Sequence, residues 1–203
     1  MRPFFLCLEG IDSAGKNTQA VMLKGALERK GFDVSLYSYR DYKSRYGEII
    51  DDFLHKKFEL EVEEQFMLYL LDMVKDGRKI WEEMGKKIII ADRYFVSAVA
   101  YQSAGGLEYL KAKEICDRIG LPRPNLVLYV DINVDLSVQR KIRNGGSPDR
   151  FEAAKDYLNR VRGVYEMLYN EGYGAESWER IDGAQDKEEV HRFVFSAAMK
   201  HIG

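Results

Sequence analysis

The chain has 203 residues, of which 46% are hydrophobic, and its formal net charge is −2 at pH 7. We therefore expect one globular domain over residues 1–203, without a general electrostatic attraction for nucleic acid or membranes. No run reaches the roughly 18 consecutive apolar residues of a membrane span, and no leader-like pattern opens the chain, so we expect a cytoplasmic protein.

Short apolar runs alternate with helical patterns along the chain. Three runs are hydrophobic at nearly every position, as in parallel strands covered on both faces: Phe4 to Leu8, Lys87 to Ala91 and Leu126 to Ile132. We expect a fourth, weaker strand over Asp33 to Tyr39, and Trp178 to Ile181 is a candidate for a fifth. Apolar periodicity predicts helices over Thr18 to Lys30, Glu61 to Met84 with an interruption near Gly77, Ala153 to Asn170 and Lys187 to Ile202. This alternation favours an α/β fold, in which a parallel sheet of about five strands has helices on both faces.

The segment EGIDSAGKNTQ, residues 9–19, joins the first strand to the first helix. Gly10 and Gly15 allow tight turns close to phosphate oxygens, and successive N–H groups can face one concavity. Lys16 adds a mobile positive charge, and the dipole of the following helix also favours an anion. The alternative is a strand-to-helix turn with a surface lysine. We predict an ATP-binding loop formed by Gly10, Ile11, Asp12, Ser13, Ala14, Gly15, Lys16, Asn17 and Thr18.

Asn17 stands where such loops normally carry a serine or threonine whose hydroxyl holds Mg²⁺. An amide oxygen can also bind this ion, so we expect Asn17 to ligate Mg²⁺. Asp92, at the end of a later strand, would hold the ion through water. Loss of catalysis, leaving a nucleotide-binding regulator, is the alternative that Asn17 suggests.

Several blocks of the chain resemble, in order, those of the thymidylate kinase family. The loop is similar to the family's E-G-x-D-x-x-G-K-[ST]-[ST]-Q, and ADRYFVSAVAYQ (91–102) is similar to D-R-[YH]-x-x-S-x-x-A-Y-Q. LPRPNLVLYVDI (121–132) resembles L-P-x-P-D-L-x-x-Y-L-D-[VI] and precedes a basic segment with DRFE, and RIDGAQDKEEVH (180–191) resembles the family's tail. The resemblance implies a P-loop NTPase-type fold, ATP-dependent phosphorylation of dTMP to dTDP, and a homodimer.

The resemblance also implies which residues bind the acceptor nucleotide. Arg93 would clamp the acceptor phosphate, whose oxygens suit a guanidinium fork, and Asp12 would receive the sugar 3′-hydroxyl. Ser97, Tyr101 and Gln102 would line the acceptor pocket. The alternatives are a structural ion pair for Arg93, a loop-stabilising carboxylate for Asp12, and packing for the others.

A phosphate-binding arginine is also implied in SYRDYKSRYGEII (38–50). Arg40 and Arg45 both remain open for this role, and we favour Arg40 because it lies nearer the end of the strand. In the family, an aromatic residue of the long helix stacks on thymine, and an arginine four residues later reaches a base carbonyl. Tyr69 suits the stacking role, with Phe66 as the alternative.

The residues four positions after Phe66 and Tyr69 are Leu70 and Met73, and neither is arginine. The missing arginine removes a charge-assisted hydrogen bond to the base. A related kinase acting on another deoxynucleoside monophosphate or on a nucleoside therefore remains an alternative.

The basic segment at about residues 140–151 predicts a lid that closes over ATP. Some family members carry a catalytic arginine at the position of Ser13, and others carry it in the lid. Because Ser13 is uncharged, we predict that Arg143 and Arg150 assist catalysis together with Asp12, Lys16 and Arg93. The alternative is a solvated basic loop.

Overall fold

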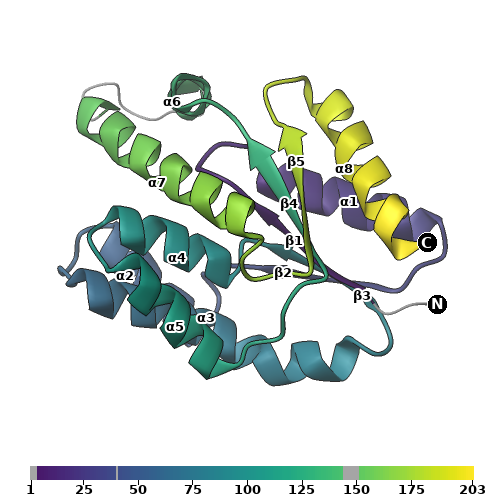
Figure 1. Ribbon diagram of the computed structural model, residues 1–203, viewed down its shortest axis with the longest axis horizontal. Helices are drawn as coiled ribbons and strands as arrows, with labels where there is room; N and C mark the ends of the chain where they lie inside the picture. The colour runs from purple at the N-terminus through teal and green to yellow at the C-terminus, as the bar shows by residue number, and fades with distance from the viewer. Residues whose placement is uncertain (1–3, 40, 144–150) are drawn as a thin grey trace.

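A parallel sheet between two layers of helices forms the core of the protein (Figure 1). The computed structural model describes residues 4–39, 41–143 and 151–203. The sheet has the order β2-β3-β1-β4-β5, and every neighbouring pair is parallel. Its strands are β1 (Phe4–Glu9), β2 (Val34–Ser38), β3 (Ile88–Asp92), β4 (Leu126–Asp131) and β5 (Ser177–Asp182). The expected α/β fold is thus confirmed.

Helices cover both faces of this sheet (Figure 1). Helices α1 (Lys16–Arg29) and α8 (Lys187–Ile202) pack together on one face. The opposite layer contains α3 (Val62–Glu83), α4 (Phe95–Ala104) and α7 (Phe151–Glu171), with α2 (Arg45–Leu54) packed on α3 and α5 (Tyr109–Ile119) on α4. Helix α6 (Val134–Arg143) follows β4 and packs against α7.

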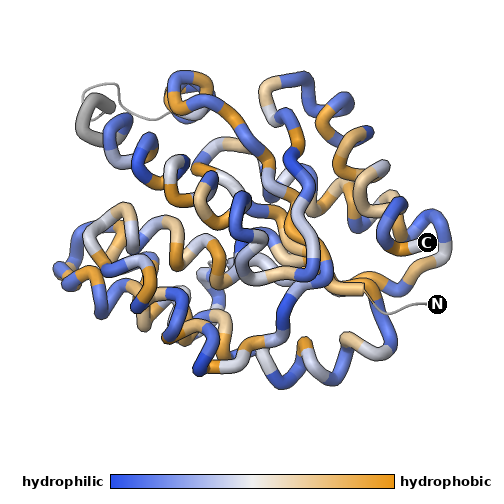
Figure 2. Tube along the Cα trace, viewed as in Figure 1, coloured by the Kyte–Doolittle hydropathy of each residue, from blue (hydrophilic) through white to orange (hydrophobic). Residues whose placement is uncertain are grey.

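The central strands are buried along almost their whole length. Every residue of β1 and β3 is buried, and in β4 only Asp131, its last residue, is partly exposed. Figure 2 shows these strands as a hydrophobic centre beneath helices of mixed polarity. Continuous apolar runs therefore form strands here because both of their faces exclude water.

The long helix differs from the expectation at Gly77. We predicted an interruption there, but α3 continues through it to Glu83. A Cβ on Gly77 would lie 3.4 Å from Leu121 Cδ2, so the glycine admits the segment before β4 close to the helix. Packing at this point outweighs the unfavourable helix propensity of glycine.

Helices α2 and α5 are among those that the periodicity of the sequence did not predict. Each buries only two residues within the helix, namely Gly47 and Ile50 in α2 and Ala112 and Cys116 in α5. At ten and eleven residues, the two helices span only about three turns each, so they offer few positions in which a helical period can be recognised.

The strand register brings polar residues to one edge of the sheet. Leu8 of β1 pairs with Asp92 of β3, which in turn pairs with Ser38 of β2. The carboxyl ends of parallel strands face the ligand crevice in open α/β sheets, so this edge is the place to look for a site.

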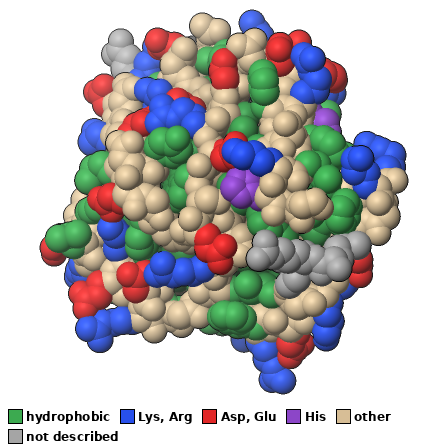
Figure 3. Space-filling model, turned by 45° about the vertical axis from the view of Figure 1, so that its right-hand side comes forward, with side chains coloured by type: hydrophobic (Ala, Val, Ile, Leu, Met, Phe, Trp, Pro, Cys, Tyr) green, Lys and Arg blue, Asp and Glu red, His purple; other side chains and the backbone are tan. Residues whose placement is uncertain are grey.

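The outer surface carries charges of both signs. Figure 3 shows lysine, arginine and acidic side chains interspersed over one face. Among the helices of the described ranges, none combines the length and apolar character that a membrane crossing requires.

Candidate active site

The glycine loop between β1 and α1 has a backbone that depends on its glycines. Gly10 has φ 141°, and a Cβ there would lie 2.4 Å from the carbonyl oxygen of Val130 in β4. Gly15 has φ 93° and forms the amino-terminal cap of α1. Ser13 also has a positive φ of 59°, which is uncommon for a residue with a side chain. The loop therefore turns sharply and ends at the positive end of the α1 dipole.

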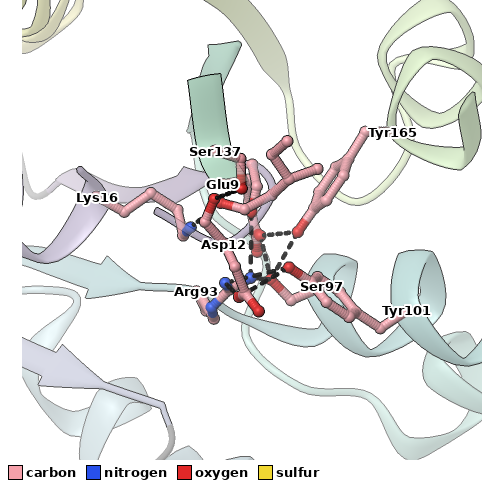
Figure 4. Close-up of polar contacts among 10 residues, drawn as sticks. Glu9, Asp12, Lys16, Arg93, Ser97, Tyr101, Ser137 and Tyr165 are labelled. Carbon is pink, nitrogen blue, oxygen red and sulfur yellow. Dashed lines mark hydrogen bonds and ion pairs between the residues drawn. The ribbon is translucent and has the colours of Figure 1, made fainter. Parts of the chain in front are cut away.

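Lys16, the first residue of α1, folds back across this loop (Figure 4). Its Nζ donates to the carbonyl oxygen of Ile11 at 2.7 Å, and the residue is only 5% exposed. Burial, followed by the charge of Arg93, lowers the pKa of Lys16 to about 7, although Asp92 and Asp12 oppose the shift. An anion in the loop would favour the charged ammonium form, because it adds negative charge beside Nζ.

Arg93 follows β3 and connects the loop to α4 (Figure 4). Its Nη2 donates to Asp12 Oδ1 at 2.5 Å and to the Tyr101 hydroxyl at 3.3 Å. Its Nη1 donates to the carbonyl oxygen of Gly10 at 3.1 Å and to Ser97 Oγ at 3.2 Å. Burial disfavours the guanidinium charge, but Tyr101 and Asp12 outweigh burial and raise the pKa of Arg93.

The backbone of Arg93 is also unusual, with φ 66°. A residue with a side chain adopts this conformation only where its surroundings enforce it, and such residues cluster at functional sites. Here the Arg93 N–H donates to the carbonyl oxygen of Leu8 at 3.0 Å, which holds the end of β3 against β1. The turn directs the guanidinium back towards the glycine loop (Figure 4).

A buried carboxylate, Glu9, lies beneath Arg93. It accepts from the backbone N–H of Tyr94 at 2.8 Å, from Ser97 Oγ at 2.5 Å and from the Tyr165 hydroxyl at 3.0 Å. Burial raises the pKa of Glu9, while the hydrogen bond from Ser97 and the charge of Arg93 oppose that shift. The network joins β1, the start of α4 and α7. Sequence reasoning missed Tyr165, because it is 156 positions away from Glu9.

A cavity of about 230 Å³ opens on one side of the loop, between the loop and helices α2, α3, α4 and α7. It brings together the six acceptor residues expected in the described ranges: Asp12, Tyr69, Arg93, Ser97, Tyr101 and Gln102. Side chains from α2, α3, α4 and α7 complete the wall, among them Phe53, Leu54, Gln65, Asp72, Met73, Ala98 and Tyr157. Charged groups and apolar surfaces thus meet in one cavity.

A second cavity, of about 350 Å³, lies on the other side of the loop. It is lined by loop and α1 residues and by residues around α6, β5 and α8: Ser13, Ala14, Gly15, Thr18, Gln19, Arg140, Arg143, Gly183, Gln185, Lys187 and Val190. Both cavities touch the same glycine loop, so a group in the loop is reachable from either side.

Arg140 is a residue of the second cavity that we did not single out from the sequence. Its guanidinium donates to the carbonyl oxygen of Ser13 at 3.3 Å and to that of Gly183 at 2.8 Å. Burial, with the nearby charge of Arg143, lowers the pKa of Arg140. Arg143 is exposed at the rim of the same cavity. The basic segment signalled an arginine here, but only the fold distinguishes the one that contacts the loop.

The remaining residues predicted for the site lie outside the acceptor cavity or outside the described residues. Arg40 and Arg150 lie outside the described residues, and Arg45 is exposed with its guanidinium 6.0 Å from the ring centre of Tyr46. Asn17 and Thr18 are exposed at the first turn of α1. Their amide and hydroxyl oxygens, with the carboxylate of Asp92, are hard oxygen donors of the kind that Mg²⁺ prefers.

A parallel sheet of this order, with a glycine loop wrapped before α1 and an arginine at the end of β3, defines a P-loop NTPase-type nucleotide-binding protein. The chain belongs to the thymidylate kinase family, because the family model "Thymidylate kinase" matches residues 8–194.

Individual relatives match over nearly the full chain. The "Probable thymidylate kinase" of Staphylothermus marinus is 34% identical over 206 residues, which cover 98% of this chain and 96% of the relative. The thymidylate kinase of Francisella tularensis subsp. novicida is 30% identical, covering 100% of this chain and 98% of its own length. That of Caenorhabditis elegans is 28% identical, covering 96% and 89%.

Proposed function

We propose that the protein transfers the γ-phosphoryl group of ATP to dTMP and so forms dTDP and ADP. One observation carries this proposal: the glycine loop separates two cavities, and Arg93 and Asp12 face the smaller one. A donor in the larger cavity and an acceptor in the smaller one would meet at the loop. In-line placement of two nucleotides is the main requirement of phosphoryl transfer.

The loop and α1 would hold the phosphates of ATP. Successive backbone N–H groups between residues 10 and 18, and the positive end of α1, favour an anion there. Lys16 would exchange its bond to the Ile11 carbonyl oxygen for the outer phosphates. Arg140 would border the nucleoside part of ATP, since it bridges the loop and Gly183 across the donor cavity.

The opposite side of the loop would hold dTMP. Arg93 would bind its phosphate, and Asp12 would accept a hydrogen bond from the sugar 3′-hydroxyl. Tyr101, which donates to Asp12 Oδ1 at 2.9 Å, would keep that carboxylate in position. Tyr69 would stack on the base, and Arg40 remains our candidate for a second contact to the phosphate.

During transfer, an oxygen of the dTMP phosphate attacks the γ-phosphorus of ATP, and the bond to the β,γ-bridging oxygen breaks. Negative charge develops on the oxygens around the γ-phosphorus, and cations stabilise it. Lys16 and Arg93 would supply positive charge from the loop side. Arg143 and Arg150 would supply it from a lid at about residues 140–151.

When bound, Mg²⁺ would supply further positive charge that stabilises the phosphates during transfer. Asn17 would offer an amide oxygen directly, and Asp92 would hold the ion through water. Titrating Mg²⁺ against turnover in the wild type and in Asn17→Ser tests the first of these roles. A changed Mg²⁺ dependence in Asn17→Ser is expected, and identical curves would remove Asn17 as a ligand.

We also propose that the protein is a homodimer. Helix α3 exposes the apolar side chains of Met67, Leu71, Val74 and Trp81, whose spacing of four, three and seven residues keeps them on one side of the helix. A double substitution, Leu71→Asp with Trp81→Asp, should convert the dimer to a monomer in light scattering coupled to size exclusion. A wild-type protein that is monomeric at micromolar concentration would contradict the proposal.

The decisive experiment for the reaction is a panel of acceptors in a coupled assay that detects ADP. The wild type is incubated with ATP, Mg²⁺ and, in turn, dTMP, dUMP, dCMP, dGMP and thymidine. We expect the highest kcat/KM with dTMP. A preference for another acceptor by more than about tenfold, which corresponds to roughly 1.4 kcal/mol, would overturn the choice of dTMP.

A further inference from the structure

The backbone of the glycine loop is held by side chains at four consecutive carbonyl oxygens. Each of these oxygens accepts a hydrogen bond from a side chain, and the pairs are Gly10 with Arg93 at 3.1 Å, Ile11 with Lys16 at 2.7 Å, Asp12 with Ser137 at 2.8 Å and Ser13 with Arg140 at 3.3 Å. Three of the four donors are cations, which a phosphate would attract. Ser137 is the neutral donor of this set.

Ser137 lies in α6 and directs its hydroxyl at the loop (Figure 4). The residue is only 2% exposed, and it is not among the described residues that line either cavity. The start of α6 is fixed beside it, because Asn133 Oδ1 accepts from the N–H of Leu136 at 2.8 Å. The Ser137 hydroxyl therefore acts on the loop and not on a nucleotide in one of the cavities.

The bond from Ser137 fixes the orientation of the peptide group between Asp12 and Ser13. In a planar trans peptide, the C=O and the N–H point in opposite directions. Since the carbonyl oxygen of Asp12 faces α6, the N–H of Ser13 points away from α6. Within the described ranges this N–H donates to no backbone carbonyl, and Ser13 lines the larger cavity, where we place ATP. A phosphate oxygen is a suitable acceptor for it.

This peptide orientation is not the relaxed one for the local backbone. Ser13 has φ 59°, a conformation that is unfavourable for a residue with a side chain. A half-turn of the peptide group would change φ of Ser13 from 59° to about −121°, within the broad β region. The same half-turn would replace the N–H by a carbonyl oxygen, which repels phosphate. The hydroxyl of Ser137 opposes this rotation, because it meets the Asp12 carbonyl oxygen only in the observed orientation.

Building on the proposed function, we propose that Ser137 is a positioning residue for the phosphate donor. Its hydroxyl keeps the peptide between Asp12 and Ser13 turned so that the Ser13 N–H binds the phosphates of ATP. The charged donors cannot give this support throughout the reaction, because Lys16 moves to the outer phosphates and Arg93 binds the acceptor phosphate. Ser137 is neutral and buried, so its bond to the loop persists while nucleotides bind and leave.

The substitution Ser137→Ala tests this role in the absence of catalysis. Alanine is favourable in a helix, so α6 is retained. Calorimetry measures the binding of ATP, of inorganic tripolyphosphate and of dTMP, each alone. Loss of one hydrogen bond to a charged ligand should weaken ATP and tripolyphosphate by about tenfold each. Binding of dTMP should stay within about threefold, since its proposed contacts are side chains. A general loss of structure would weaken all three ligands alike.

Three further variants separate the hydroxyl from the volume of the side chain. Ser137→Cys is close in size but is a weak donor, so it should repeat the tenfold loss, roughly, for tripolyphosphate. Ser137→Thr keeps a hydroxyl on the same carbon and should bind tripolyphosphate within about threefold of the wild type. The matched control is Ser177→Ala on β5, which removes a hydroxyl bond of 3.1 Å to the carbonyl oxygen of Asn125 and should leave tripolyphosphate binding within about twofold.

Each result supports or contradicts the inference. A tripolyphosphate affinity of Ser137→Ala within about twofold of the wild type would overturn it, as would an equal loss for dTMP or a folded Ser137→Thr that binds as weakly as Ser137→Ala. If Ser137→Ala does not fold, as thermal unfolding would show, Ser137→Cys decides alone. Absence of phosphoryl transfer to any acceptor would contradict the proposed function, whereas a selective loss of tripolyphosphate binding in Ser137→Ala would still support this inference.

Discussion

The two cavities that share the glycine loop are built in different ways. The donor side of the loop depends on consecutive residues, since Gly10, Ser13 and Gly15 bend the backbone and α1 directs its positive end into the turn. The acceptor side depends on side chains from the loop and four helices, and Arg93 has partners both in the loop and in α4. In the proposed function, the backbone of the loop would hold the phosphates of ATP, whereas side chains that the fold brings together would bind the acceptor.

This contrast implies that substitutions are tolerated more readily on the acceptor side of the loop than on the donor side. A backbone cradle tolerates few substitutions, because a side chain at Gly10 would collide with β4. The acceptor wall consists mainly of separate side chains on helices, so one of them, such as that of Met73, can be substituted without disturbing the loop. Predictions that treat the two sides separately test whether they are independent.

The largest effect is expected from Arg93, which belongs to both sides. Arg93→Ala removes hydrogen bonds to Asp12, Ser97 and Tyr101 and should lower kcat/KM for dTMP by roughly 10³-fold. Steady-state kinetics checks this loss. The matched control is Arg78→Ala on α3, whose side chain is 93% exposed and which should stay within about twofold of the wild type. An Arg93→Ala protein that keeps more than about a tenth of its activity would show that the acceptor side does not depend on this residue.

Lys16 tests the donor side and predicts a dependence on pH. Its pKa is about 7 in the free protein, and bound phosphates would raise that pKa. Above pH 7 the free lysine is increasingly neutral, so ATP binding must take up a proton, and affinity should fall by up to about tenfold per pH unit. Calorimetry at pH 8 in two buffers with different ionisation heats measures the uptake.

Two lysine variants separate this titration from other groups. Lys16→Met should lose the proton uptake and about 10²-fold in kcat/KM for ATP. Lys24→Met, on the same helix but paired with Glu28, should retain both. An ATP affinity of the wild type that is constant between about pH 6.5 and 9 would contradict the assigned role of Lys16.

The arginines of the basic segment after β4 are expected to have different roles on the donor side. Arg140 contacts the loop and Gly183 in the described structure, so Arg140→Ala should raise KM for ATP by about tenfold with a small change in kcat. Arg143→Ala and Arg150→Ala should instead lower kcat by about 10²-fold or more while ATP affinity changes little. Full turnover in both of these variants would show that the lid assignment is wrong.

The smallest effect is expected on stability, from the buried hydrogen-bond network around Glu9. Tyr165→Phe removes a buried hydrogen bond of 3.0 Å to Glu9 and should lower the free energy of unfolding by about 1 kcal/mol. Tyr109→Phe removes a bond of the same length to Glu171 at the surface and should cost less than about 0.5 kcal/mol. Urea denaturation compares the two variants, and equal losses would indicate that burial of Glu9 adds nothing to this contact.

The strands and the main helices were predictable because continuous apolar runs and helical periodicity record burial directly. The loop residues from Gly10 to Thr18 were equally accessible, since they are consecutive. The interruption expected at Gly77 was wrong, because propensity does not record the close approach of Leu121. The short helix α2 was missed because its ten residues span only about three turns.

The sequence by itself determined the phosphate loop, the parallel sheet and the family, because these depend on local pattern and on motifs carried in order along the chain. The tertiary structure decided which side chains meet. It joined Glu9 to Tyr165, set Arg140 against Ser13 and placed the Ser137 hydroxyl against the carbonyl oxygen of Asp12. Hydrogen bonds act over about 3 Å in space, irrespective of separation along the chain, so only a folded chain reveals which donors and acceptors remain for a substrate.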